Sequence, residues 1–192
     1  MKNTIYRIYV EKKPGFDGEA VSLLRDLREN LGLAGLERVR ILNRYDIAGI
    51  TEEIYRQGRT TVFAEPTVDW AYDEDFPLDR DEKVFAVEYL PGQYDQRADS
   101  AAQCLQIITR QERPQVLTAK VIVLKGELSP ADLERVKAYY INPVDSREAS
   151  LAKPETLDLE VQEPEDVEIL EGFTGKTEEE LESIHKAMEL AM

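Results

Sequence analysis

Residues 10–15 read VEKKPG, and residues 87–92, 77 positions later, read VEYLPG. Four of the six letters agree. The same offset places Val39 on Val116 and Pro66 on Pro143 without gaps. A Pro-Gly pair commonly ends a strand, which explains the last two letters but not the shared register. The chain is therefore predicted to contain two related halves.

Both halves have the same predicted order of elements. Tyr6, Ile8 and Val10 alternate toward one face, as in a half-buried strand. Leu23 and Leu27 belong to an apolar stripe with helical spacing. The predicted strands and helices are 6–10, 17–32, 39–47, 51–61 and 67–72 in the first half, and 84–87, a helix from about 96, 116–124, 129–140 and 143–146 in the second.

These elements predict an α+β fold. The first repeat covers residues 1–74 and the second covers 75–150. Each is a βαβαβ-like unit with open sheet edges. Pairing two such edges satisfies backbone N–H and C=O groups that could otherwise pair with other chains and cause aggregation. We therefore expect a fused pseudo-dimer with one shared, mostly antiparallel or mixed sheet and with helices on one face.

The sequence changes character after residue 150. Residues 151–176 contain Pro154 and Pro164 and few large apolar side chains, which predicts an extended linker. Thr177 and Glu180 then have the spacing of a capping box. The amphipathic helix that follows reaches residue 192 without a stop signal, so 177–192 are expected to be truncated from a longer chain.

The net charge of −15 is unevenly distributed. Residues 1–50 carry +2 and 84–150 carry −1, whereas 51–83 carry −6 and 151–192 carry −10. This acidity argues against nucleic-acid and anionic-membrane partners. The N-terminus lacks the features of a signal peptide, and the single cysteine excludes an internal disulfide. A reducing, cytoplasmic location is expected.

The sequence offers little catalytic chemistry. Cys104 is expected to pack as a small buried hydrophobe, and His185 lies on the separate terminal helix. The segment 172–177, GFTGKT, follows a possible strand at 167–170 and resembles a phosphate loop, but its motif is incomplete and three glutamates follow it. The carboxylates show no metal-loop spacing. We predict no catalytic, cofactor-binding or metal-binding residues in this chain.

One loop differs between the two halves. Residues 91–100 read PGQYDQRADS and concentrate hydrogen-bonding side chains, whereas the equivalent stretch 14–20 reads the plainer PGFDGEA. Symmetry alone would make the two loops alike. The second copy is therefore predicted to make a specific contact.

This loop, extended to LPGQYDQRADSA at 90–101, and the segment INPVDSR at 141–147 closely resemble the N-terminal region of large, single-chain phosphoribosylformylglycinamidine synthases (FGAM synthases) of purine biosynthesis. The resemblance runs from about residue 6 to residue 150 and continues into 177–192, which it implies to be the truncated start of that family's helical linker domain. It implies two fused copies of the small scaffold subunit that split forms of the enzyme use.

By this resemblance, the parent ligase hydrolyses glutamine and passes ammonia to a synthetase core that uses ATP and Mg²⁺. The core converts formylglycinamide ribonucleotide into its amidine. This chain lacks both catalytic parts, so alone it is expected to have no activity or cofactor. Its implied partners are the synthetase and glutaminase domains. The residues expected to dock them are Gln93, Asp95, Gln96, Arg97, Asp99, Asn142, Asp145, Ser146 and Arg147.

Two alternatives remain open from the sequence. The chain could be a free-standing, ferredoxin-like regulatory module that binds a small effector, such as an amino acid, between its halves. It could also be a separate scaffold subunit whose catalytic domains are supplied by other chains.

Overall fold

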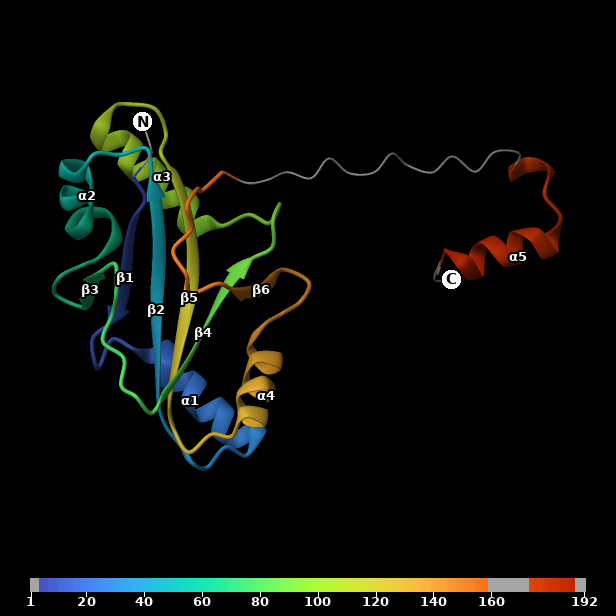
Figure 1. The fold of residues 1–192 in the computed structure, drawn as a ribbon, viewed down its shortest axis with the longest axis horizontal. Coiled ribbons are helices and arrows are strands. Elements are labelled where there is room, and N and C mark those ends of the chain that lie inside the picture. Colours follow the sequence, from blue (N-terminus) through green and yellow to red (C-terminus); the bar gives the residue numbers. More distant parts are fainter. Residues whose placement is uncertain (1–3, 159–172, 189–192) are drawn as a thin grey trace. The chain divides into compact units, whose positions relative to one another are not determined.

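A computed structural model describes residues 4–158 and 173–188 (Figure 1). The chain falls into two compact units, Met1–Leu159 and Glu160–Met192, which are described separately below. The possible strand at 167–170 and the end of the predicted terminal helix at 189–192 lie outside the described residues.

The first unit runs through strand, helix, strand, helix and strand, and then through the same order again. The first five elements are β1 (Tyr6–Lys12), α1 (Gly18–Leu31), β2 (Leu36–Ala48), α2 (Glu52–Gly58) with a π-helical turn (Arg59–Phe63), and β3 (Asp69–Asp73). The next five are β4 (Glu82–Tyr89), α3 (Gln96–Thr109), β5 (Gln115–Gly126), α4 (Pro130–Tyr140) and β6 (Ser146–Ala149). The second unit contains a short 3-10 turn (Phe173–Gly175) and α5 (Glu178–Ala187).

The six described strands form one sheet in the order β3-β1-β2-β5-β4-β6. Every pair of neighbours is antiparallel. The long strands β2 and β5 lie side by side at the centre (Figure 1), where Asn43 is paired with Lys120. The predicted α+β class is confirmed, and of the two predicted sheet types the antiparallel one is found.

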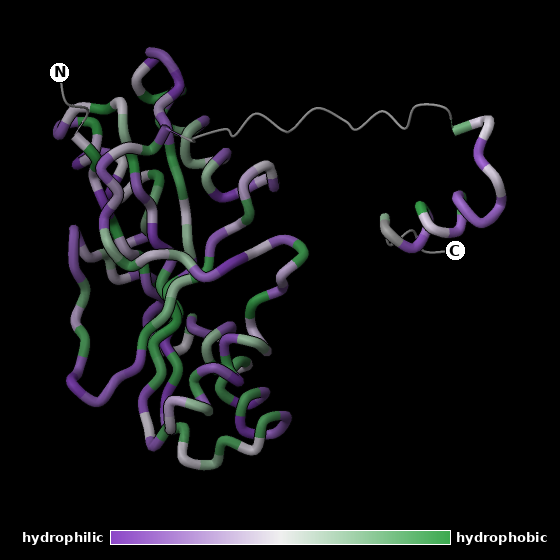
Figure 2. The backbone as a smooth tube through the Cα atoms, turned by 45° about the vertical axis from the view of Figure 1, so that its right-hand side comes forward, coloured by the Kyte–Doolittle hydropathy of each residue, from purple (hydrophilic) through white to green (hydrophobic). Residues whose placement is uncertain are grey.

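The two faces of the sheet are covered differently. On one face, Leu27 of α1 and Val136 of α4 join one apolar cluster, and Tyr55 of α2 and Leu105 of α3 join a second. The cluster on the other face combines strand residues with Phe76, from the segment between β3 and β4. Because both faces carry an apolar cluster, residues 121–124 of β5 are all buried, and hydrophobic stretches are visible within the first unit in Figure 2. The helices therefore cover one face, and segments without helix cover the other.

Local sequence signals explain where helices begin. Ser129 and Asp132 form a capping box in front of Pro130, so the predicted start of α4 is confirmed. The predicted capping box of Thr177 and Glu180 is also found at the start of α5.

Two predicted boundaries are wrong. The helix expected at 51–61 ends as an α-helix at Gly58 and continues as the π-helical turn. The short strand expected at 143–146 lies instead at Ser146–Ala149. The main-chain carbonyl of Asn142 accepts hydrogen bonds from the N–H groups of Asp145 and Ser146, which turns the chain before the strand begins.

Candidate functional site

A cavity of about 670 Å³ opens on the helix-covered face, beside α3. We call it the α3 cavity. Its walls come from α3, from the central strands and from the segment that joins α4 to β6. The lining residues are Tyr45, Val62, Val87, Glu88, Tyr89, Asp95, Gln96, Arg97, Ser100, Ala101, Cys104, Thr118, Ala119, Lys120, Tyr140, Asn142, Asp145 and Ser146.

Small side chains on α3 explain why this space is open. α1 and α3 both have 14 residues and both follow an aspartate at the N-cap. Counted from those caps, Leu23 and Leu24 of α1 correspond to Ala101 and Ala102 of α3. Of the two alanines, Ala101 lines the cavity, and a leucine at this position would occupy part of its volume. The pocket beside α1, which Ala20 helps to line, is smaller, at about 150 Å³.

The cavity collects six of the nine residues expected to dock partners: Asp95, Gln96, Arg97, Asn142, Asp145 and Ser146. The other three are not among its lining residues. Gln93 is exposed in the turn before α3, Asp99 binds Tyr94 and Arg113, and Arg147 forms an ion pair with Glu88 at 2.8 Å.

Main-chain and side-chain hydrogen bonds hold the two predicted segments together. The Leu90 N–H donates to the carbonyl of Asp145 at 2.9 Å, which joins the loop before α3 to the loop before β6. The Asp95 carboxylate caps α3 by accepting from the Ala98 N–H at 2.9 Å. Its other oxygen accepts from the Thr118 hydroxyl at 2.7 Å, which ties the helix to β5. The wall around Asp95 is thus rigidly positioned.

Charged and aromatic side chains lie along the cavity. Arg97 Nη1 donates to the Tyr45 hydroxyl at 3.3 Å. Lys120 is already paired with Glu19 of α1. Tyr140 packs edge-on against Phe85, with the ring centroids 6.1 Å apart. Burial, together with the negative charge of Glu19, raises the pKa of Tyr140 to about 12.

The structure corrects the expectation for Cys104 and adds residues that the sequence did not single out. Cys104 is exposed and lines the cavity instead of packing in the core. Arg97, Ser100 and Cys104 recur along α3 at intervals of three and four residues, so they share one flank of the helix. From that spacing, the sequence could have predicted that these three residues lie together. Tyr45 comes from the other half of the chain, and no local sequence pattern predicts its place in the cavity.

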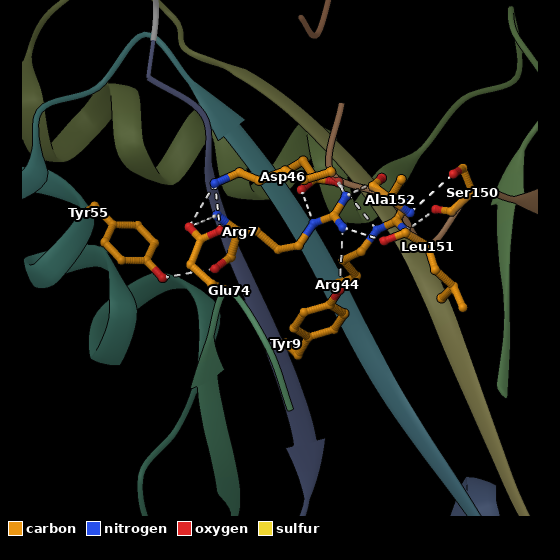
Figure 3. Close-up of polar contacts among 10 residues, drawn as sticks. Arg7, Tyr9, Arg44, Asp46, Tyr55, Glu74, Ser150, Leu151 and Ala152 are labelled. Atoms are coloured by element: carbon orange, nitrogen blue, oxygen red, sulfur yellow. Dashed lines mark hydrogen bonds and ion pairs between the residues drawn. The ribbon is translucent and has the colours of Figure 1, made fainter. Parts of the chain in front are cut away.

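A second polar site lies on the opposite face of the sheet, where Arg7, Arg44 and Asp46 are buried (Figure 3). We call these three residues the charge cluster. Arg7 binds the Asp46 carboxylate through two parallel hydrogen bonds, Nε–Oδ1 at 2.6 Å and Nη2–Oδ2 at 2.8 Å. Arg44 Nε lies 3.3 Å from Asp46 Oδ2. Burial lowers the pKa of Arg44, although the charge of Asp46 opposes this effect.

The charge cluster holds residues 150–158, which we call the strap. Arg44 Nη1 donates to the carbonyl of Ser150 at 2.6 Å, and Arg7 Nη1 donates to that of Leu151 at 2.8 Å (Figure 3). Further along, Leu157 is buried with Ile5 and Ala48. The first part of the predicted linker is therefore packed on the sheet.

No family model and no curated protein sequence matches this chain. Among the helices of residues 4–158 and 173–188, none has both the length and the apolar character needed to cross a bilayer. Within the same residues, no group of three or more His, Cys, Asp or Glu side chains is arranged to hold a metal ion.

Proposed function

We propose that this chain is the scaffold domain of a glutamine-dependent ligase of the FGAM synthase type, and that the α3 cavity receives a partner domain. One observation carries the proposal: six residues chosen from the sequence as docking residues, in two segments more than 40 positions apart, line a single cavity. In this role the domain would position the glutaminase next to the ATP- and Mg²⁺-dependent synthetase, so that ammonia can pass between them. The proposed location is the cytoplasm.

The strand registers support the tandem repeat that this proposal includes. Tyr9 pairs with Tyr72 across β1 and β3, and the residues 77 positions later, Ala86 and Ala149, pair across β4 and β6. At the centre, Asn43 pairs with Lys120, which is its own counterpart at that offset. We therefore treat 1–74 and 75–150 as two copies, followed by a linker and by the start of a helical domain at 177–192.

The rim of the α3 cavity favours a protein partner. Tyr89 and Arg97 both line the cavity; Tyr89 is 50% exposed, and Arg97 is exposed as well. Tyrosine and arginine are enriched in protein interfaces and among the residues that contribute most to binding. The first copy, whose helix has Leu23 where α3 has Ala101, has the smaller pocket, which agrees with docking at one of two otherwise similar positions.

A small-effector module remains the second candidate, because about 670 Å³ is within the usual range for small-molecule sites. The open, exposed rim favours the scaffold role over it. Ala101→Leu separates the two. In the ligase assembled with this chain, filling the cavity should reduce glutamine-dependent synthesis far more than ammonia-dependent synthesis if partners dock there. A loss of amino-acid binding with unchanged synthesis would support the effector module instead.

The scaffold proposal is tested by the same two assays on Arg97→Ala. We expect glutamine hydrolysis to continue while less of its ammonia reaches product, and ammonia-dependent synthesis to be largely retained. Arg25→Ala, which changes an exposed arginine of α1, is the matched control. An equal loss of both activities in Arg97→Ala, or turnover of ATP or glutamine by the purified chain alone, would argue against the scaffold role.

A further inference from the structure

Arg97 is the cation of the α3 cavity whose charge is not matched by another residue of the described part of the chain. Its guanidinium contacts the Tyr45 hydroxyl at 3.3 Å. Among the residues that the structure describes, no carboxylate lies within ion-pair distance of it. Lys120, the other lysine or arginine of the wall, is paired with Glu19.

Three carboxylates line the cavity wall; Asp145 forms no ion pair with Arg97 in the described structure, and the other two are already engaged elsewhere. Asp95 accepts from the Ala98 N–H and from Thr118. Glu88 is paired with Arg147. Rotating either carboxylate toward Arg97 would break these contacts, so neither can neutralise it at no cost.

A segment that enters the cavity will remove water from Arg97. A buried guanidinium without a counter-charge is strongly unfavourable. A carboxylate offers the best match, since its two oxygens accept the paired N–H groups of the guanidinium. The Tyr45 hydroxyl accepts from Arg97, which leaves its own hydrogen to donate to the same carboxylate.

On the proposal that the α3 cavity receives a partner domain, we infer that the entering segment carries an aspartate or glutamate whose carboxylate pairs with Arg97. Ala101 and Cys104, on the same side of α3, line the space that the stem of such a side chain would occupy. The widely exposed rim at Tyr89 fits a protruding loop of a protein better than an enclosed small ligand.

The test measures the affinity of this chain for the remaining domains of the ligase. Arg97→Gln removes the charge from a pair that is buried on docking and should weaken binding by roughly 30-fold or more. Arg97→Glu should weaken binding further. Arg97→Lys keeps the positive charge but loses the paired N–H groups of the guanidinium, so its affinity should lie between those of the wild type and Arg97→Gln. Arg25→Gln on α1 should bind like the wild type. Propionate should compete with docking, and propionamide, of the same shape without charge, should not.

A parallel measurement with Ala101→Leu separates the inference from the proposed function. If Ala101→Leu abolishes docking while Arg97→Gln and Arg97→Glu bind normally, the cavity is a docking site but the carboxylate inference is wrong. If Ala101→Leu docks with wild-type affinity, the α3 cavity is not the docking site and both ideas fail. Circular dichroism and urea unfolding of each variant confirm that differences in binding do not reflect unfolding.

Discussion

Arg7 and Asp46 form a two-point ion pair on adjacent strands, with 2% and 3% of their side chains exposed. This pair does more than join β1 to β2. The remaining nitrogen of the Arg7 guanidinium donates to the carbonyl of Leu151 in the strap. One arginine thus links the first strand of the fold to a segment 144 residues later. The path of the chain after β6 is set by side chains near its beginning.

Asp46→Asn tests whether this cluster depends on charge. The amide keeps the shape of the carboxylate but leaves two buried guanidiniums without their counter-ion, so we expect a loss of about 3–5 kcal/mol in the free energy of unfolding. Urea unfolding measures this loss. Limited proteolysis should also show earlier cleavage within the strap, because Arg7 and Arg44 would no longer be held toward it.

The control for Asp46→Asn is Glu52→Gln, which makes the same chemical change in an ion pair with Arg56 that is largely exposed. Exposed pairs of this kind contribute only about 0.3–0.5 kcal/mol. Equal effects of the two substitutions would mean that burial of the charge cluster adds nothing to stability.

Much of the strand arrangement could be predicted because its pattern is local. Alternation in Tyr6, Ile8 and Val10 identifies β1, and the capping signals at Ser129 identify the start of α4. The hidden face of the sheet was harder. Part of its cover comes from Phe76, between β3 and β4, and part from the strap, whose composition is that of a linker and whose Leu157 is buried against Ile5 and Ala48. Contacts between such distant segments have no period to detect.

The charge cluster had one signal that comparison of the two halves could have revealed. The residues 77 positions after Arg7, Arg44 and Asp46 are all valines, at 84, 121 and 123. Two valines of that set are buried in the apolar cluster of the same face. Charged residues in the first half, at positions where the second half has valine, indicate a buried polar site. They do not indicate which main-chain carbonyls that site binds.

The α3 cavity was predictable in part for a similar reason. The contrast between the two Pro-Gly loops pointed to Asp95 and Arg97, which do line it. The depth of the cavity depends on Ala101 facing the sheet where α1 has leucine, and Tyr45 enters from the other half of the chain. Both the depth of the cavity and the position of Tyr45 depend on how the two halves of the chain pair. The residue pattern within one half does not specify that pairing.

Gly126→Ala tests the close crossing of two chain segments at the end of β5. Gly126 has φ of +138°, and a Cβ there would lie 2.2 Å from the carbonyl oxygen of Gly35. Both strain and overlap oppose a side chain, so we expect a loss of about 3 kcal/mol or more in urea unfolding. Gly92→Ala is the control, since its φ is +90° but nothing lies within 4 Å. It should lose only about 1–2 kcal/mol, from strain alone. Similar losses in both variants would show that the crossing can relax.

Tyr140 predicts how stability responds to alkaline pH. Its pKa is raised by burial to about 12, so the folded state favours the protonated phenol. The stabilisation that goes with this is fully present below the ordinary pKa of about 10 and declines as the pH rises from there toward 12.

In a spectrophotometric titration, Tyr140→Phe should remove one tyrosine that ionises late. The unfolding free energy of this variant should also fall less steeply above pH 10 than that of the wild type. Tyr139→Phe, at an exposed neighbour, should leave the late step in place. A wild-type curve without that step would mean that the Tyr140 hydroxyl reaches solvent through the α3 cavity.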